Sequence, residues 1–140
     1  MRAVWFLSRL VFGAVFVYAG AMKMADAAGF AATVFNYQIL PANMVYGAAM
    51  IVPALEVVCG VSLWVNSLAR AASVILNLMM VAFMGALGWA MARGLDVECG
   101  CFGAAGSSGA REALIRDAVI LAVGLLAMWG AFATSDDDKV

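Results

Sequence analysis

The chain contains no histidine and only three cysteines among its 140 residues. The absence of histidine excludes bis-histidine haem and removes the commonest side-chain ligand of zinc and copper. Charged residues are also scarce, at 12% of the chain, whereas 66% of residues are hydrophobic and the mean hydropathy is +1.01. This balance is typical of an integral membrane protein.

Four apolar segments are long enough to cross a bilayer, which takes about 20 helical residues. They run from Ala3 to Met22, from Val45 to Val65, from Ala71 to Ala92 and from Leu114 to Ala133. The first is long for the apolar region of a signal peptide and contains Arg9, so we expect it to be retained. The sequence predicts an all-α, four-helix membrane bundle as one domain over residues 1–134, with an acidic tail over 135–140.

The connection between the first two spans is predicted to contain a short helix in the membrane interface. Asp26 is a candidate N-cap, and Pro41 is expected to end the segment. Between them, apolar residues recur at near-helical spacing, namely Phe30, Val34, Tyr37 and Ile39.

Arg9 and Glu56 are the two charged residues that lie well inside the spans, and a charge at the bilayer centre costs at least ~2.5 kcal/mol. At about 1.5 Å per residue, both lie roughly 16–20 Å from the face that bears Cys99 and Cys101. We therefore expect a buried ion pair between Arg9 and Glu56. Cys59 and Asn77 fall at a similar depth, so the four residues are predicted to form one polar layer. Such a layer either orients the helices or forms a proton or quinone site.

Cys99 and Cys101 are separated by one glycine in the connection between the last two spans. A disulfide across one residue is strained and easily reduced, and it gains little from closing a loop, so the pair indicates redox or soft-metal chemistry. If the disulfide forms, its loop lies on the oxidising, extracytoplasmic side of a bacterial inner membrane, and both termini are cytoplasmic. Basic residues leave the orientation undecided, because the two faces carry similar numbers.

Three charged residues are expected near the face that carries the cysteines: Lys23, Arg116 and Asp117. A nearby cation favours thiolate over thiol, so Lys23 and Arg116 are candidates for tuning Cys99 or Cys101, with Asp117 as a pairing partner for one of them. The alternative is that they anchor helix ends at the headgroups. Lys23, Tyr37 and Arg116 are also the candidate residues for holding a quinone between the helices.

These residues follow one another in a recognisable order: Arg9, Gly20 and Lys23; Tyr37 and Leu40-Pro41; Pro53 and Glu56; Cys99-Gly100-Cys101-Phe102-Gly103; and Arg116-Asp117. The ordered set resembles the MauE branch of the DoxX-like membrane proteins over nearly the whole chain. The resemblance implies a four-helix membrane bundle and a link to periplasmic thiol redox, because MauE proteins are associated with maturation of the disulfide-rich methylamine dehydrogenase. Other DoxX-like proteins are tied to quinone-linked sulfur oxidation or oxidative-stress complexes.

The cysteine count departs from the better-known four-helix membrane thiol oxidases, which use a Cys-x-x-Cys beside a quinone and a second, shuttling pair. The leading hypothesis is a thiol-disulfide redox component in which Cys99 and Cys101 exchange electrons with a periplasmic thioredoxin-like or disulfide-bearing protein and with a quinone. One alternative is a membrane carrier that passes a soft metal or sulfur species towards Cys59 and Glu56. Another is a noncatalytic subunit of a redox complex. Besides the lipid bilayer, a second copy or a complex remains open as a partner, and no nucleic acid is expected.

Overall fold

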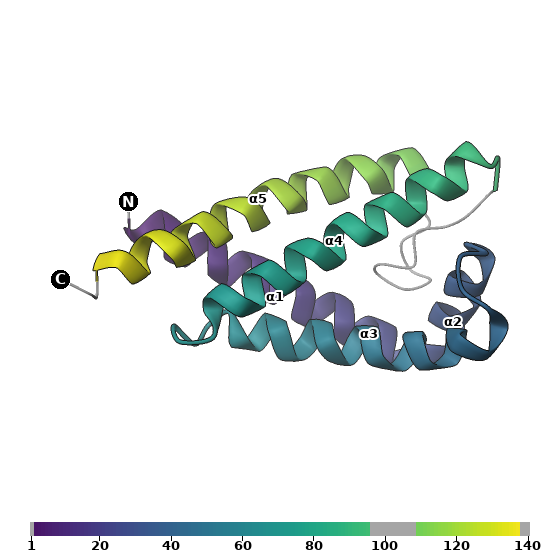
Figure 1. Cartoon of the computed structure of the whole chain (residues 1–140), viewed down its shortest axis with the longest axis horizontal. Coiled ribbons are helices and arrows are strands. Elements are labelled where there is room, and N and C mark those ends of the chain that lie inside the picture. The colour runs from purple at the N-terminus through teal and green to yellow at the C-terminus, as the bar shows by residue number, and fades with distance from the viewer. Residues whose placement is uncertain (1, 96–108, 138–140) are drawn as a thin grey trace.

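The computed structural model describes residues 2–95 and 109–137, and every regular element in these ranges is a helix. The helices are α1 (Arg2–Ala25), α2 (Ala27–Asn36), α3 (Ala42–Ser62), α4 (Ala69–Ala92) and α5 (Ala110–Asp137) (Figure 1). Four of them contain segments long and apolar enough to cross a membrane: Arg2–Ala25, Ala42–Ser62, Ala69–Ala92 and Arg111–Thr134. The predicted all-α fold with four spans and a short helix between the first two is confirmed.

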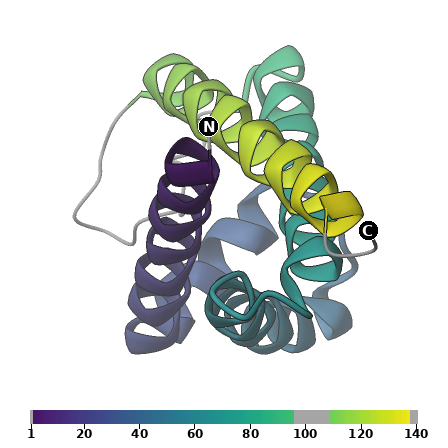
Figure 2. The same cartoon turned by 90° about the vertical axis from the view of Figure 1, so that its left-hand side faces the viewer.

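The four long helices form a closed bundle in which each one contacts two others. α1 packs on α3 and α5, and α4 packs on the same two helices from the other side. α1 begins and α5 ends at one end of the bundle, which also holds the link between α3 and α4 (Figure 1). We call this the terminal end, and Figure 2 is viewed from it. α2 lies at the opposite end, which we call the α2 end.

α2 begins where Asp26 predicted, but it ends earlier than Pro41 predicted. The Asp26 carboxylate accepts a hydrogen bond from the backbone N–H of Gly29 (3.0 Å), which caps the first turn. α2 ends at Asn36 and is followed by Gln38 in the left-handed region (φ 53°), so the chain leaves the helix before the proline. Pro41 is instead the N-cap of α3. The expectation that Pro41 ends the short helix is therefore wrong.

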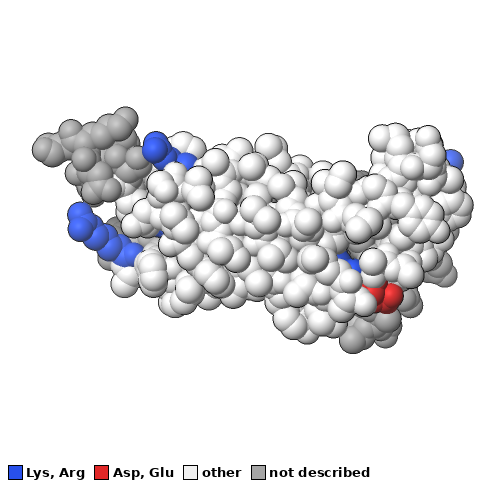
Figure 3. Space-filling view, turned by 90° about the horizontal axis from the view of Figure 1, so that it is seen from below, with Lys and Arg blue, Asp and Glu red and all other residues white. Residues whose placement is uncertain are grey.

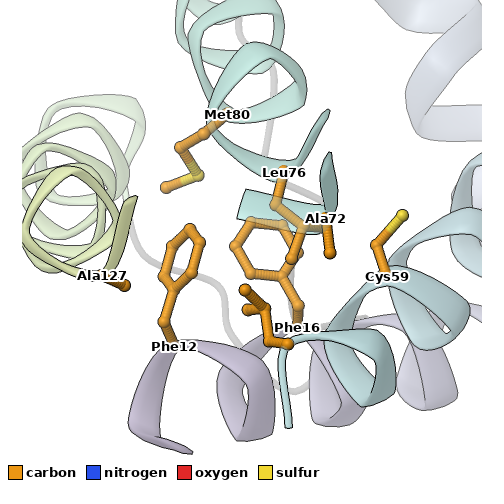
Figure 4. Packing of buried hydrophobic residues seen from close by; sticks show 8 residues of the cluster. Phe12, Phe16, Cys59, Ala72, Leu76, Met80 and Ala127 are labelled. Atoms are coloured by element: carbon orange, nitrogen blue, oxygen red, sulfur yellow. The ribbon is translucent and has the colours of Figure 1, made fainter. Parts of the chain in front are cut away.

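The apolar core lies between α1 and α4. Phe12 and Phe16 pack edge to face, with ring centroids 4.9 Å apart, and both belong to a cluster with Leu76 and Met80 (Figure 4). The buried positions of α1 recur every three or four residues, which places them on one face of the helix. That face begins with Arg9 and ends with Lys23, so the helix buries a charge towards each end of its apolar stripe.

The outer surface of the bundle is apolar around its middle. Val58, Leu78 and Val119, from three different spans, are each more than 60% exposed. On the face shown in Figure 3, Lys, Arg, Asp and Glu lie towards the two ends, and the surface between them carries none of these residues. A surface of this kind is stable against hydrocarbon rather than water. The protein is therefore a multi-pass membrane protein in contact with the lipid bilayer.

Candidate functional site

Lys23 is positioned by the close contact between α1 and α3. Gly20, one turn before it, lies so near α3 that a Cβ there would be 2.7 Å from Val57 Cγ2 and 2.8 Å from the carbonyl oxygen of Pro53. Small residues permit such approach between helices in lipid. Because side chains on a helix lean towards its N-terminus, Lys23 extends along this contact into the bundle, where it is 2% exposed.

The Lys23 ammonium meets a carboxylate that is as deeply buried as itself. Lys23 Nζ donates to Glu56 Oε1 over 2.6 Å, and the Glu56 side chain is 1% exposed. Removing two charges from water is costly, and only close pairing offsets that cost. The second carboxylate oxygen, Glu56 Oε2, has no hydrogen-bond partner among the described residues. Within the described residues, one carboxylate oxygen of Glu56 is therefore bonded to Lys23, and the other can still accept a hydrogen bond.

Two aromatic rings from different helices complete the surroundings of the lysine. Its Nζ lies 5.1 Å from the ring centroid of Phe30 on α2 and 4.8 Å from that of Phe83 on α4. The electron-rich face of an aromatic ring attracts a cation at this range, and more strongly where water is excluded. Lys23 is therefore held by contributions from four helices, including its own. α2 is the element that covers it at this end of the bundle.

A third ionisable residue, Asp117 on α5, lies against the same space. Its side chain is 2% exposed, and its Oδ1 lies 3.4 Å from Arg116 Nη2. Lys23, Glu56 and Asp117 line one small cavity together with apolar side chains that include Phe16, Met80 and Phe83. The cavity holds about 20 Å³, which is room for one water molecule. We call these three residues the charged triad.

A comparison with protein families shows which family the chain belongs to. The model of the family described as methylamine utilisation protein MauE matches residues 1–130. The chain belongs to the MauE family. No curated protein and no solved structure gives a significant match.

The chain is thus a membrane protein of a family that is described as one of methylamine utilisation. All three members of the charged triad lie within the matched residues, as do Arg9, Cys59 and Asn77. The family match adds a biological setting to the bundle, and the structure adds the arrangement of its buried charges.

The expected ion pair between Arg9 and Glu56 is wrong. Arg9 donates from Nε and Nη2 to the carbonyl oxygen of Leu63 (3.1 and 2.6 Å) and from Nη1 to Asn66 Oδ1 (3.1 Å). Leu63 follows Glu56 by seven residues, a helical rise of about 10 Å. Counting from one assumed membrane plane put the two charges level, whereas the antiparallel contact of α1 with α3 places Arg9 beside the end of α3.

The four residues of the predicted polar layer, Arg9, Glu56, Cys59 and Asn77, have different partners in the structure. Cys59 is buried in the apolar cluster of Figure 4, among residues that include Phe16 and Leu76. Asn77 donates to the carbonyl oxygens of Ser73 (2.7 Å) and Gly124 (3.0 Å), which ties α4 to α5. Neither residue touches the Lys23–Glu56 pair through a hydrogen bond described here. Among the described residues, Glu56 is therefore hydrogen-bonded to Lys23 and to none of Arg9, Cys59 and Asn77.

The predicted quinone residues lie at the α2 end but do not share one described cavity. Tyr37 is buried with Leu87 and Ala113, Lys23 is paired with Glu56, and Arg116 contacts Asp117. Sequence reasoning missed the part played by Phe83. In the sequence, Phe83 is one of many apolar residues of α4, and nothing in its spacing indicates that its ring faces the Lys23 ammonium.

Cys99 and Cys101 lie outside the described residues. After α4 ends at Ala92, the described chain continues to Leu95 and resumes at Gly109, before α5. Leu95 packs in the cluster of Tyr37 and Ala113, at the α2 end. Within residues 2–95 and 109–137, no three His, Cys, Asp or Glu side chains are grouped to hold a metal ion.

Proposed function

We propose that this MauE-family protein is a membrane thiol-disulfide redox component of the inner membrane. In this proposal Cys99 and Cys101 exchange electrons with a periplasmic thioredoxin-like or disulfide-bearing protein, and a quinone accepts the electrons. The observation that carries the proposal is the charged triad, buried at the end of the bundle where the segment with both cysteines leaves α4 and enters α5.

The triad supports redox chemistry because thiol oxidation releases protons as well as electrons. Intramembrane acids and bases are costly and commonly mark proton pathways. Here Lys23 and Glu56 are in direct contact and Asp117 lines the same cavity, so three groups that hold protons converge on one point. Asp117 is also paired with Arg116, so the four charges form two ion pairs. The feature that favours proton transfer is that both carboxylates line one cavity and that Glu56 Oε2 has no hydrogen-bond partner among the described residues.

The proposed reaction balances in two steps. A partner thiolate attacks the Cys99–Cys101 disulfide to form a mixed disulfide, and the second thiolate of the partner displaces it. The partner is then oxidised by two electrons, and both cysteines are thiols. Those thiols next give two electrons to a quinone, which takes up two protons and leaves as quinol, while the disulfide re-forms. Glu56 and Asp117 would hold and deliver these protons.

The first test is a redox titration of the full chain in lipid nanodiscs. We expect mass-resolved alkylation to show one two-electron couple, within the range of known thiol oxidoreductases of roughly −120 to −270 mV. Cys99→Ser and Cys101→Ser should each abolish the couple, whereas Cys59→Ala should keep it because Cys59 is buried in the apolar core. A couple that survives Cys101→Ser would contradict the proposal. Dependence on Cys59 would favour the carrier instead.

The same samples test the triad by turnover, with dithiothreitol as electron donor and a water-soluble ubiquinone analogue as acceptor. Glu56→Gln should slow quinone reduction by about 10²-fold, the usual contribution of a positioned acid or base. The Cys99–Cys101 couple should remain. Glu112→Gln removes an exposed carboxylate of α5 and is the matched control. Equal rates in the two variants would remove the triad from the reaction.

We also propose that both termini are cytoplasmic and that Cys99 and Cys101 face the periplasm. The support is chemical, since a resting disulfide requires an oxidising compartment. Lys23 lies inside the bundle, so it no longer counts as a basic residue of the periplasmic face.

A membrane-impermeant maleimide on intact, reduced cells tests this orientation. We expect Cys99 and Cys101 to be labelled without lysis. In a variant whose three native cysteines are replaced, Ser67→Cys at the terminal end should be labelled only after lysis. The reverse pattern would show that the protein has the opposite orientation in the membrane. Cys99 and Cys101 would then lie in a reducing compartment, which would contradict the proposal.

A further inference from the structure

The cavity beside the charged triad contains a buried hydrogen-bond acceptor. Glu56 lines this cavity, and its Oε2 accepts no hydrogen bond from the described residues, although the side chain is only 1% exposed. Leaving a buried polar atom without a partner costs more than a typical hydrogen bond gains. Such atoms are usually bonded to the protein or to an ordered water molecule. The cavity is therefore a candidate site for a small hydrogen-bond donor.

The size of the cavity limits what that donor can be. Its volume is about 20 Å³, and roughly 10–15 Å³ of such volume is enough for one water molecule. A quinone ring is too large to enter. The other lining residues are apolar and come from three helices, so among the described residues only the triad offers polar side-chain atoms: Val15, Phe16, Ala19, Met80, Phe83 and Ile120 complete the walls.

The triad offers a water molecule the number of partners that buried waters usually have, which is about three. An ammonium has three N–H donors, and Lys23 uses one of them on Glu56 Oε1 over 2.6 Å. Glu56 Oε2 can accept one hydrogen bond from the water. Asp117 can accept another, because a carboxylate has about four lone-pair sites and its contact with Arg116 Nη2 is long, at 3.4 Å. One donor and two acceptors thus match the hydrogen-bonding capacity of water.

The charges around the cavity favour a neutral ligand over an ion. Each acid is in contact with one base, since Glu56 pairs with Lys23 and Asp117 with Arg116. A metal cation in the cavity would lie against the Lys23 ammonium, and an anion would lie against two carboxylates. Both arrangements place like charges close together in a medium of low dielectric constant, where repulsion is strong. A water molecule avoids this repulsion.

We propose that this cavity binds one water molecule, which accepts a hydrogen bond from Lys23 and donates to Glu56 Oε2 and to the Asp117 carboxylate. The water joins two ion pairs that share no hydrogen bond among the described residues, Lys23–Glu56 and Arg116–Asp117. It connects α1, α3 and α5 at one point inside the bundle. Binding of the water does not depend on the cysteines.

The water also gives the two carboxyl groups a route for proton exchange, a step that rests on the proposed redox function. When Asp117 is protonated, it gives its proton to the water while the water gives one of its own to Glu56. Two O–H bonds break and two form, so the water is regenerated. The reverse transfer follows the same path. A proton thus passes between α5 and α3 without movement of either helix.

Hydroxyl-radical footprinting of the full chain in nanodiscs tests the water directly. X-ray radiolysis forms radicals from bound water as well as from bulk water, and mass spectrometry locates the modified side chains. Phe16 lines the cavity, whereas Phe12 packs against the Phe16 ring in the same apolar cluster and does not line it. Both are buried, at 4% and 1% exposure. We expect Phe16 to be modified several-fold faster than Phe12, and equal rates would overturn the site.

A substitution that fills the cavity shows whether the radical comes from this water. Ala19 lines the cavity, and the two added methyl groups of Ala19→Val should displace the water and lower the Phe16 rate to that of Phe12. Ala21→Val adds the same side chain on the exposed face of α1 and should keep the faster rate. A fast Phe16 rate in Ala19→Val would assign the labelling to bulk water and overturn the proposal. Circular dichroism of both variants confirms that the helices are intact.

The turnover assay tests the proton exchange separately from the water. Ala19→Val should slow quinone reduction by about 10²-fold, as expected for loss of a positioned acid or base, while Ala21→Val should match the unmodified chain. Equal turnover of the two variants, with the Phe16 labelling lost only in Ala19→Val, would overturn the exchange step. The labelling involves no thiol chemistry. Loss of the Cys99–Cys101 couple would therefore contradict the redox function and leave the labelling result unaffected.

Discussion

Replacing Lys23 with methionine should lower the free energy of unfolding of the protein in mixed micelles by about 3–5 kcal/mol. Methionine has nearly the length of lysine and fits the same space, so the loss is one of charge. It leaves the Glu56 carboxylate buried in a cavity with Phe16, Met80 and Phe83, and no other described cation lies within hydrogen-bonding distance of it. The change is measured by tryptophan fluorescence during titration with a denaturing detergent.

Glu56→Leu should cost less than Lys23→Met, although it breaks the same ion pair. The Lys23 ammonium keeps its two aromatic neighbours and still faces the cavity that Asp117 lines. Cation–π contacts contribute about 2 kcal/mol or more where water is excluded. The difference between the two single variants thus measures how much of the lysine's stabilisation comes from outside the pair.

The double variant Lys23→Met/Glu56→Leu should be closer to the unmodified protein than either single variant. Two apolar side chains of similar volume remove both the attraction and the cost of burying the charges, an exchange that is often neutral in buried pairs. The coupling energy across this cycle should therefore be several kcal/mol. If the losses simply add, the pair does not interact in the membrane-embedded protein. Glu112→Gln, an exposed change, is the control and should have little effect.

The spans could be predicted from composition because lipid imposes a uniform demand on every residue that faces it. The third span was expected from Ala71 and begins at Ala69, and both end at Ala92. The fourth was expected over Leu114 to Ala133 and lies in a helix that runs from Ala110 to Asp137. Hydropathy detects the part of a helix in contact with hydrocarbon, whereas hydrogen bonding continues the helix into the polar region.

The partner of Glu56 could not be predicted by counting residues along the spans. Depth estimates assumed that all helices start at one plane and that side chains extend sideways. In the structure α3 begins at Ala42, three residues before the expected span, and Lys23 leans back along α1 towards Glu56. Phe30 then covers the lysine because α2 folds against the bundle. These are tertiary facts that no single segment contains.

The second prediction concerns the contact between α1 and α3, which one added methyl group should disrupt. At Gly60 a Cβ would lie 2.9 Å from the carbonyl oxygen of Gly13, and at Gly13 a Cβ would lie 2.7 Å from the carbonyl oxygen of Gly60. Both obstacles are backbone atoms, so no side-chain rotation relieves them, and the helices must separate. We expect Gly60→Ala to cost about 1–3 kcal/mol of unfolding free energy.

Gly47→Ala, on the same helix, is the matched control for Gly60→Ala. A Cβ at Gly47 would meet no atom within 4 Å. Alanine is the better helix former by roughly 0.5–1 kcal/mol, so this variant should be neutral or more stable. The two substitutions are chemically identical and differ only in what the methyl group touches. Equal effects at both positions would mean that α1 and α3 do not pack as closely as described.

Gly20→Ala connects the helix contact to the charged triad. Its Cβ would lie 2.8 Å from the carbonyl oxygen of Pro53 and 3.2 Å from Glu56 Cβ, so the helices must move apart where Lys23 reaches Glu56. We expect the Lys23/Glu56 coupling, measured by the same double-mutant cycle, to fall sharply in the Gly20→Ala background. It should persist with Gly47→Ala. An unchanged coupling would show that the 2.6 Å contact tolerates separation of the helices, and that the lysine, rather than the glycine, sets its geometry.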